Sequence, residues 1–219
     1  MGVFVVFEGP EGSGKTTQIR LLRDALQAAG REVLCTREPG GTPIGEQIRE
    51  ILHAVDNVSM LPITEALLYS AARAQHVGEV IRPALEQGGF VVSDRYAYST
   101  LAYQGDGHGV DRSMLQQMTQ WATGGLVPDL VVYLDLEVTE GLRRKQEASG
   151  EGGEWNRMDQ LAVAFHRTVR QSYLRMSQED PTRWLVIDAG QPAEIIHREI
   201  RYRIEELFDR SGFVPVQGG

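Results

Sequence analysis

Five short apolar runs alternate with longer amphipathic stretches along the chain. The runs lie at residues 3–7, 32–36, 90–93, 130–136 and 184–188, and most of them are nearly continuous hydrophobic segments. Such runs are typical of parallel strands that are covered on both faces. Helical spacing of apolar residues occurs at 16–29, 44–53, 63–86, 113–122, 138–148, 160–177 and 193–208. Strand–helix alternation of this kind predicts right-handed crossovers and an α/β sandwich.

The chain shows no internal repeat, no low-complexity tract and no interdomain linker. Its richest glycine segment, residues 149–154, falls between two helical patterns, which indicates a mobile connection rather than a domain boundary. The tail, about residues 211–219, is expected to fray. We therefore predict one domain over residues 1–219.

Composition narrows the classes of protein. Of the 219 residues, 42% are apolar and 24% are charged, as in ordinary globular proteins. The net charge of −8 argues against nucleic-acid binding, which favours basic faces. The one cysteine, Cys35, forms no internal disulfide and lies in a run that reads as a buried strand. The first apolar run stops at Glu8, far short of the ~20 residues of a membrane span. We expect a cytoplasmic protein that binds no membrane.

A phosphate-binding loop follows the first apolar run. Gly9 to Thr16 match the pattern G-x4-G-K-[ST] between a predicted strand and a predicted helix. Glycines let backbone N–H groups converge on an anion, and the helix N-terminus adds its dipole. Lys15 supplies a positive charge, and the Thr16 hydroxyl is placed to ligate Mg2+. The motif predicts nucleoside triphosphate binding but leaves the fate of the γ-phosphate open.

Three classes of protein share this loop. A GTP switch needs a base-reading N-K-x-D motif, which is missing, and residues 106–109 match D-x-x-G only trivially in what we expect to be a glycine-rich loop. Motor and transporter ATPases are usually larger and carry further signature segments. A small-molecule kinase needs a second anion pocket that holds an acceptor in line with the donor.

Three further clusters favour the kinase. Asp94 and Arg95 emerge at the carboxyl end of an apolar run, where α/β ligand sites lie, and Asp94 is suited to organising Mg2+. The segment "TREPGGTPIGEQIRE" turns at Pro39 between two arginines, Arg37 and Arg49, that can grip an anion. In "LLYSAARAQH", Tyr69 and Arg73 lie four apart on one helical face, suited to a flat base.

Taken together, "FEGPEGSGKTTQ", "TREPGGTP", "LLYSAARAQH", "DRYAYSTLAYQG", "PDLVVYLDL" and "VIDAGQP" resemble the thymidylate kinases of the bacterial type, which belong to the P-loop nucleoside monophosphate kinases. The resemblance covers nearly the whole chain. It implies a three-layer fold with a five-stranded parallel sheet flanked by helices. It also implies ATP with Mg2+ as donor, dTMP as acceptor, dTDP as product, and a homodimer. A kinase for another monophosphate and a non-catalytic nucleotide-binding module remain the alternatives.

The resemblance also implies roles for individual residues. Glu11 contacts the acceptor sugar and phosphate region, Tyr69 stacks on thymine, and Arg73 reads a base carbonyl. Tyr103 crowds the 2′ position and so favours deoxyribose. Expected ATP-binding residues are Gly9, Pro10, Glu11, Gly12, Ser13, Gly14, Lys15, Thr16, Thr17, Ala189 and Gln191. Expected acceptor-binding residues are Glu11, Arg37, Pro39, Arg49, Tyr69, Arg73, Arg95, Thr100, Tyr103 and Gln104, with Thr16 and Asp94 toward the metal.

A lid is expected at about residues 143–158. Relatives whose phosphate loop lacks a basic residue usually supply cations from the lid, and the loop here has Gly12 after Glu11. The lid's cations are Arg143, Arg144, Lys145 and Arg157, whereas Gln146 and Ala148 stand where relatives often carry arginine. The first three cations could instead simply solvate a helix end. We predict Arg144 and Arg157 as catalytic residues beside Lys15, Asp94 and Arg95.

Overall fold

Five parallel strands form a single sheet at the centre of the computed structural model, which describes residues 2–150 and 156–212. The strands are β1 (Val3–Glu8), β2 (Leu34–Arg37), β3 (Phe90–Asp94), β4 (Leu130–Asp135) and β5 (Trp184–Asp188). Their order across the sheet is β2-β3-β1-β4-β5, and each neighbouring pair runs parallel. The predicted five-stranded parallel sheet is confirmed.

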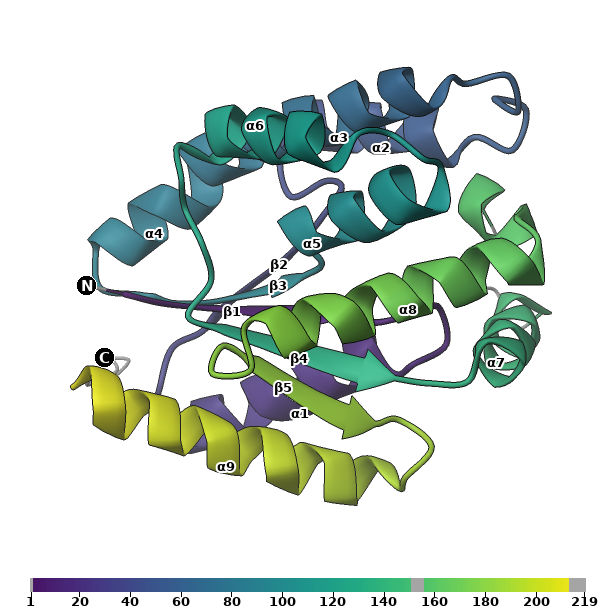
Figure 1. Ribbon diagram of the computed structural model, residues 1–219. Helices are drawn as coiled ribbons and strands as arrows, with labels where there is room; N and C mark the ends of the chain where they lie inside the picture. Colours follow the sequence, from purple (N-terminus) through teal and green to yellow (C-terminus); the bar gives the residue numbers. More distant parts are fainter. Residues whose placement is uncertain (1, 151–155, 213–219) are drawn as a thin grey trace.

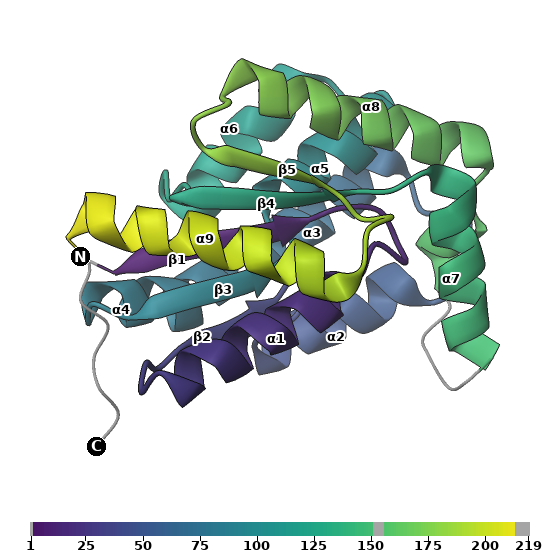
Figure 2. The ribbon, with the colours of Figure 1, turned by 90° about the horizontal axis from the view of Figure 1, so that it is seen from below.

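Helices cover both faces of this sheet (Figure 1). They are α1 (Lys15–Ala28), α2 (Pro43–His53), α3 (Pro62–His76), η1 (Val77–Ile81), α4 (Arg82–Glu86), α5 (Ala97–Thr100), η2 (Leu101–Gly107), α6 (Arg112–Thr123), α7 (Val138–Gly150), η3 (Arg157–Gln160), α8 (Val163–Glu179) and α9 (Ala193–Ser211). Helices α1 and α9 lie on one face, and α4, α6 and α8 lie on the other, as the views in Figures 1 and 2 agree.

The core explains why the strands read as continuous apolar runs. Along β1, Val3, Val5 and Phe7 pack toward α1 and α9, whereas Phe4 and Val6 pack toward the opposite layer. Successive side chains of a strand point to opposite faces, so a strand covered on both faces needs apolar residues at every position.

Two expectations about local structure are wrong. The run around Cys35 is not a buried strand, because β2 is the edge strand of the sheet; Leu34 is 38% exposed and Cys35 is half-buried. Residues 106–109 do not form a glycine-rich loop throughout, because η2 carries helical structure from α5 as far as Gly107. A Cβ at Gly107 would meet the ring of Phe165, so this glycine permits close packing against α8 rather than breaking the helix.

Part of the predicted lid and tail lies outside the described residues, namely 151–155 and 213–219. Within the ranges that are described, no helix is long and apolar enough to cross a membrane.

Candidate active site

A cavity of about 520 Å³ opens at the carboxyl ends of β1, β2 and β3. This is the edge of a parallel sheet where α/β proteins bind their ligands. Its walls come from the β1–α1 loop, the segment after β2, α2, α3, the α5–η2 stretch, and α7. The lining residues are Glu11, Gly12, Ser13, Gly14, Lys15, Thr16, Thr17, Arg37, Glu38, Pro39, Arg49, His53, Tyr69, Asp94, Arg95, Ser99, Thr100, Tyr103, Gln104, Arg144, Lys145, Ala148, Asn156 and Met158.

The phosphate loop forms the floor of the cavity. Gly12 and Gly14 have φ angles of +71° and +88°, which L side chains rarely adopt, and α1 begins directly after Gly14. The Lys15 Nζ donates to the carbonyls of Gly9 and Pro10, each at 3.1 Å. Burial, with Arg95 nearby, lowers the pKa of Lys15 although Glu11 and Asp94 oppose the shift. Loop and lysine together make an anion site.

Oxygen atoms suited to a metal ion stand beside this floor. Within the part of the chain that the structure describes, Asp94 Oδ1 and Ser13 Oγ are buried without a hydrogen-bond partner. Thr16 lines the same cavity with its side chain exposed. Carboxylate and hydroxyl oxygens are hard ligands of the kind that Mg2+ takes together with substrate phosphates. The residues present therefore match the ion that the family implies.

Glu11 and Arg95 form a charged pair at the centre of the cavity. The Arg95 Nη2 contacts Glu11 Oε1, and the Lys145 Nζ lies 3.7 Å from Glu11 Oε2. Burial works against ionisation, but Arg95, Lys15 and Lys145 hold the pKa of Glu11 well below its usual range. Arg95 has a φ of +70°, an unfavourable conformation for a residue with a side chain, and its guanidinium lies 5.3 Å from the centre of the Tyr103 ring.

Glu8 supports this centre from behind. Its carboxylate accepts hydrogen bonds from the backbone of Tyr96 (3.0 Å), from Ser99 Oγ (2.7 Å) and from the Tyr173 hydroxyl (2.7 Å). Arg95 Nη1 lies 3.9 Å away, and burial raises the pKa of Glu8. Sequence reasoning missed this residue, because its partners are 88 to 165 positions distant and no local pattern announces them.

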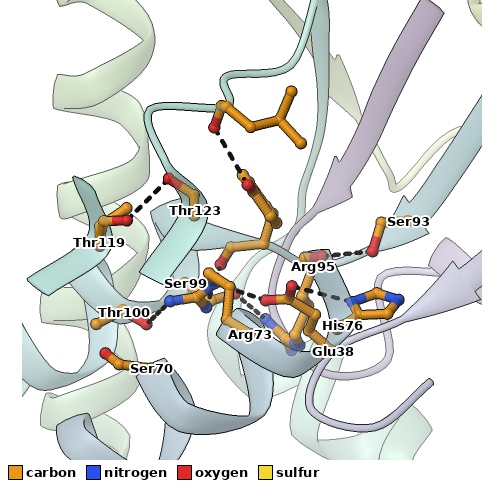
Figure 3. A network of polar contacts seen from close by, with 12 residues as sticks. Glu38, Ser70, Arg73, His76, Ser93, Arg95, Ser99, Thr100, Thr119 and Thr123 are labelled. Atoms are coloured by element: carbon orange, nitrogen blue, oxygen red, sulfur yellow. Dashed lines mark hydrogen bonds and ion pairs between the residues drawn. The ribbon is translucent and has the colours of Figure 1, made fainter. Parts of the chain in front are cut away.

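A second buried network lies behind the part of the cavity lined by Glu38 and Thr100 (Figure 3). The Arg73 Nε donates to Glu38 Oε2 at 2.7 Å, and its Nη1 donates to Thr100 Oγ1 at 3.0 Å. His76 Nδ1 is 3.1 Å from Glu38 Oε1. Arg73 is only 1% exposed and does not line the cavity, so the structure places it behind Thr100 and Glu38 rather than directly in the wall. Glu38 is a second residue that sequence reasoning missed.

Arg37, Pro39 and Arg49 meet at one side of the cavity, as their spacing predicts. Arg37 Nη2 donates to Glu46 Oε2 at 2.8 Å, and Arg49 Nη1 donates to the carbonyl of Pro39 at 3.1 Å. Tyr69 lines the cavity from α3, and burial raises the pKa of its hydroxyl. An aromatic ring and two guanidinium groups thus border one compartment.

The predicted lid cations separate in space. Arg144 lines the cavity, and its Nη1 donates to the carbonyl of Ala189 at 3.2 Å. A Cβ at Gly12 would clash with the carbonyl oxygen of Gly141, so the packing of α7 on the loop leaves no room for a loop cation there. Lys145 also lines the cavity, although the sequence placed it among the lid cations and not among the predicted catalytic residues.

Arg157 does not join the cavity. It is 7% exposed, its Nε donates to the carbonyl of Leu52 at 3.2 Å, and its Nη2 pairs with Glu65. The expected catalytic role of Arg157 therefore receives no support from its position, because a buried carboxylate already holds its charge. Gly9, Pro10, Ala189 and Gln191 also lie outside the lining, the first two with carbonyls turned to Lys15.

Comparison with known proteins agrees with this geometry. The family model for thymidylate kinase matches residues 7–200. A thymidylate kinase of Roseiflexus sp. (strain RS-1) is 50% identical over 213 residues, which cover 94% of each chain. One of Thermomicrobium roseum is 50% identical over 215 residues, covering 98% of this chain and 100% of the relative. The crystal structure of thymidylate kinase from Ehrlichia chaffeensis superposes with a TM-score of 0.74 at 29% identity, covering 93% of this chain and 98% of that one. With a phosphate loop, a cavity lined by several arginines and this likeness over nearly its whole length, the chain belongs to the thymidylate kinase family.

Proposed function

We propose that this cavity transfers the γ-phosphate of ATP to dTMP, yielding dTDP and ADP, with the residues described above in defined roles. The observation that carries the proposal is that one cavity joins a phosphate-binding loop to a second set of cations and an aromatic ring. Two anions can therefore bind side by side, as an in-line transfer between phosphates requires.

The donor side of the reaction rests on the loop and on α1. Backbone N–H groups around Gly12 to Lys15 bind the phosphates of ATP, and the Lys15 ammonium leaves the loop carbonyls to neutralise their charge. Thr16 and Asp94 would hold Mg2+, which when bound supplies charge neutralisation for the phosphates. The turn at Ala189 lies next to Arg144 and is our proposed adenine side.

On the acceptor side, Arg37, Arg49 and Arg95 hold the phosphate of dTMP. Arg95 is fixed by Glu11 and by the network around Glu8, so its guanidinium is already oriented between the two anion sites. Because a phosphate oxygen is the nucleophile, the reaction needs no strong general base. Catalysis comes from positioning and from cations facing the transferring group, including Arg144 and Lys145 of the proposed lid.

Selection of the nucleoside is assigned to the aromatic residues. Tyr69 offers a face for stacking on thymine. Tyr103 is held by the Arg95 cation above its ring, and its bulk is proposed to exclude a ribose 2′-hydroxyl. The Tyr103→Ala variant should therefore accept a ribonucleotide better, relative to the unmodified chain.

A homodimer belongs to the same proposal. Along α3, Ile63, Leu67, Ala71 and Ala74 form an exposed apolar stripe at helical spacing, and on α6 Trp121 is 82% exposed. Sedimentation or light scattering tests it: Leu67→Glu should convert a dimer into a monomer, whereas a monomeric unmodified chain contradicts the proposal.

The cytoplasm remains our proposed compartment, with Cys35 as a free thiol.

Coupled ADP-release measurements across deoxynucleoside monophosphates test the reaction itself. The expected result is turnover selective for dTMP. Turnover with another monophosphate in preference to dTMP would indicate the alternative kinase. Nucleotide binding by calorimetry without any turnover would indicate a binding module.

A further inference from the structure

Two buried charges stand directly behind the part of the cavity wall formed by Thr100 and Gln104. On one side lies Arg73, which donates to Thr100 Oγ1 at 3.0 Å. On the other side lies Glu65, 1% exposed, whose Oε1 accepts from Gln104 Nε2 at 2.6 Å. Neither charge lines the cavity, whereas Thr100 and Gln104 both do. The two lining residues are four positions apart in the continuous α5–η2 helical stretch, so they lie next to each other on one face.

The chemistry of Glu65 fixes which way round the Gln104 amide sits. A carboxylate is an acceptor only, so it binds the amide nitrogen and excludes the amide oxygen. The other Glu65 oxygen, Oε2, pairs with Arg157 Nη2, while His108 Nε2 lies 3.6 Å from Oε1. With its nitrogen bound to Glu65, Gln104 has its amide oxygen left for a ligand in the cavity. Gln104 is therefore an acceptor.

The opposite argument applies to Thr100. A guanidinium is a donor only, so the Thr100 oxygen accepts from Arg73 and its O–H proton is left to donate. The wall then presents one donor and one acceptor side by side. This pair complements the edge of a 4-oxo pyrimidine, where the O4 acceptor adjoins the N3–H donor. Cytosine presents the reverse pattern, an amino donor beside the N3 acceptor.

We propose that Glu65 is a positioning residue for base selection, which holds Gln104 as an acceptor so that the cavity takes a 4-oxo pyrimidine and rejects a 4-amino pyrimidine. The inference rests on the proposed function, because it concerns the acceptor in the same cavity. It also gives Arg157 a role: this arginine pairs with Glu65 and holds its carboxylate in place instead of acting on the phosphoryl group.

The test compares kcat/KM for dTMP and dCMP in the unmodified chain and in variants at Glu65 and Gln104, with one control variant. In Glu65→Gln the neutral side chain can donate as well as accept, so Gln104 can turn round. We expect KM for dTMP to rise, the ATP constant and kcat to change little, and the dTMP-to-dCMP ratio to fall about 5- to 150-fold. Glu86→Gln, an exposed glutamate on α4, is the matched control and should leave the ratio unchanged. A ratio that is unaltered in Glu65→Gln, or equal losses with every monophosphate, would overturn the proposal.

Gln104→Met separates positioning from folding, because it removes the amide and leaves the Glu65–Arg157 pair intact. It should lose the same discrimination, and adding Glu65→Gln to it should cost no further discrimination. Retained discrimination in Gln104→Met, or additive losses in the double variant, contradicts a role of Glu65 through Gln104. If Glu65→Gln does not fold, Gln104→Met alone decides the outcome. A failure of the unmodified chain to turn over dTMP would instead refute the proposed function.

Discussion

Neighbouring cations on α7 have different partners, and this arrangement gives a sharp prediction for Lys145→Met. Arg143 pairs outward with Glu140 and Glu147 and is 55% exposed. Lys145 points inward, with its Nζ 3.7 Å from Glu11 and 3.9 Å from Asp159. Methionine keeps the length of the lysine stem and removes its charge.

The size of the effect follows from these positions. A unit charge about 4 Å from an anion contributes about 4 kcal/mol at an effective dielectric constant near 20. If Lys145 faces the transferring phosphoryl group as it now faces Glu11, its loss should lower kcat about 10²- to 10³-fold. The exposed pairs of Arg143 are worth at most about 1 kcal/mol of stability, so Arg143→Met should keep kcat within a few-fold.

The assay is kcat at saturating dTMP and ATP, measured by ADP release, with Arg143→Met as the matched control from the adjacent position. Near-normal kcat in Lys145→Met would refute the reasoning and leave Lys15, Arg95 and Arg144 as the sufficient cations. An equal loss of kcat in Arg143→Met would refute it too, because the loss would then depend on the net charge of α7 rather than on a cation that faces the cavity.

Three other outcomes are expected. Arg157→Met leaves Glu65 without its buried ion-pair partner, so the melting temperature should fall by about 10 °C. The kcat of this variant at saturating dTMP should stay within a few-fold. An unchanged melting temperature together with a large loss of kcat would restore a catalytic role for Arg157. Burial, with Glu11 nearby, raises the pKa of Asp159 to about 6, so between about pH 4 and pH 6 the native chain holds a proton that the unfolded chain has lost. Urea unfolding should therefore show stability falling as pH rises through that window, and Asp159→Asn should remove that contribution to the slope. Arg144→Met should lower kcat at least tenfold while leaving KM for dTMP nearly unchanged, because this side chain contacts Glu140 and the carbonyl of Ala189 rather than the residues proposed to bind dTMP.

Hydrophobic patterning predicted the sheet well, because the three central strands β1, β3 and β4 are buried along nearly their whole length. The phosphate loop was also predictable from the sequence, since Gly12 and Gly14 adopt backbone angles that favour glycine. The sequence did not predict the supporting carboxylates, Glu8 and Glu38. Glu8 ends an apolar strand like any solvent-facing residue, and only the fold brings Ser99 and Tyr173 to it.

The lid shows a different limit. Sequence spacing placed Arg157 among the cations of a catalytic segment, but its direction depends on Glu65, which lies 92 residues away. Likewise, the sequence predicted Arg73 as a residue that contacts the acceptor base, yet Glu38 and Thr100 hold it one layer behind the cavity surface. Local patterns identify which residues carry charge, whereas tertiary partners decide which charges face the cavity.

The most direct test of the central claim is a crystal structure of the chain with dTMP and a non-hydrolysable ATP analogue. We predict the triphosphate on the loop at Lys15, the dTMP phosphate against Arg95, and thymine between Tyr69 and the segment carrying Pro39. Thymine density elsewhere, or an acceptor phosphate remote from Arg95, would contradict the account.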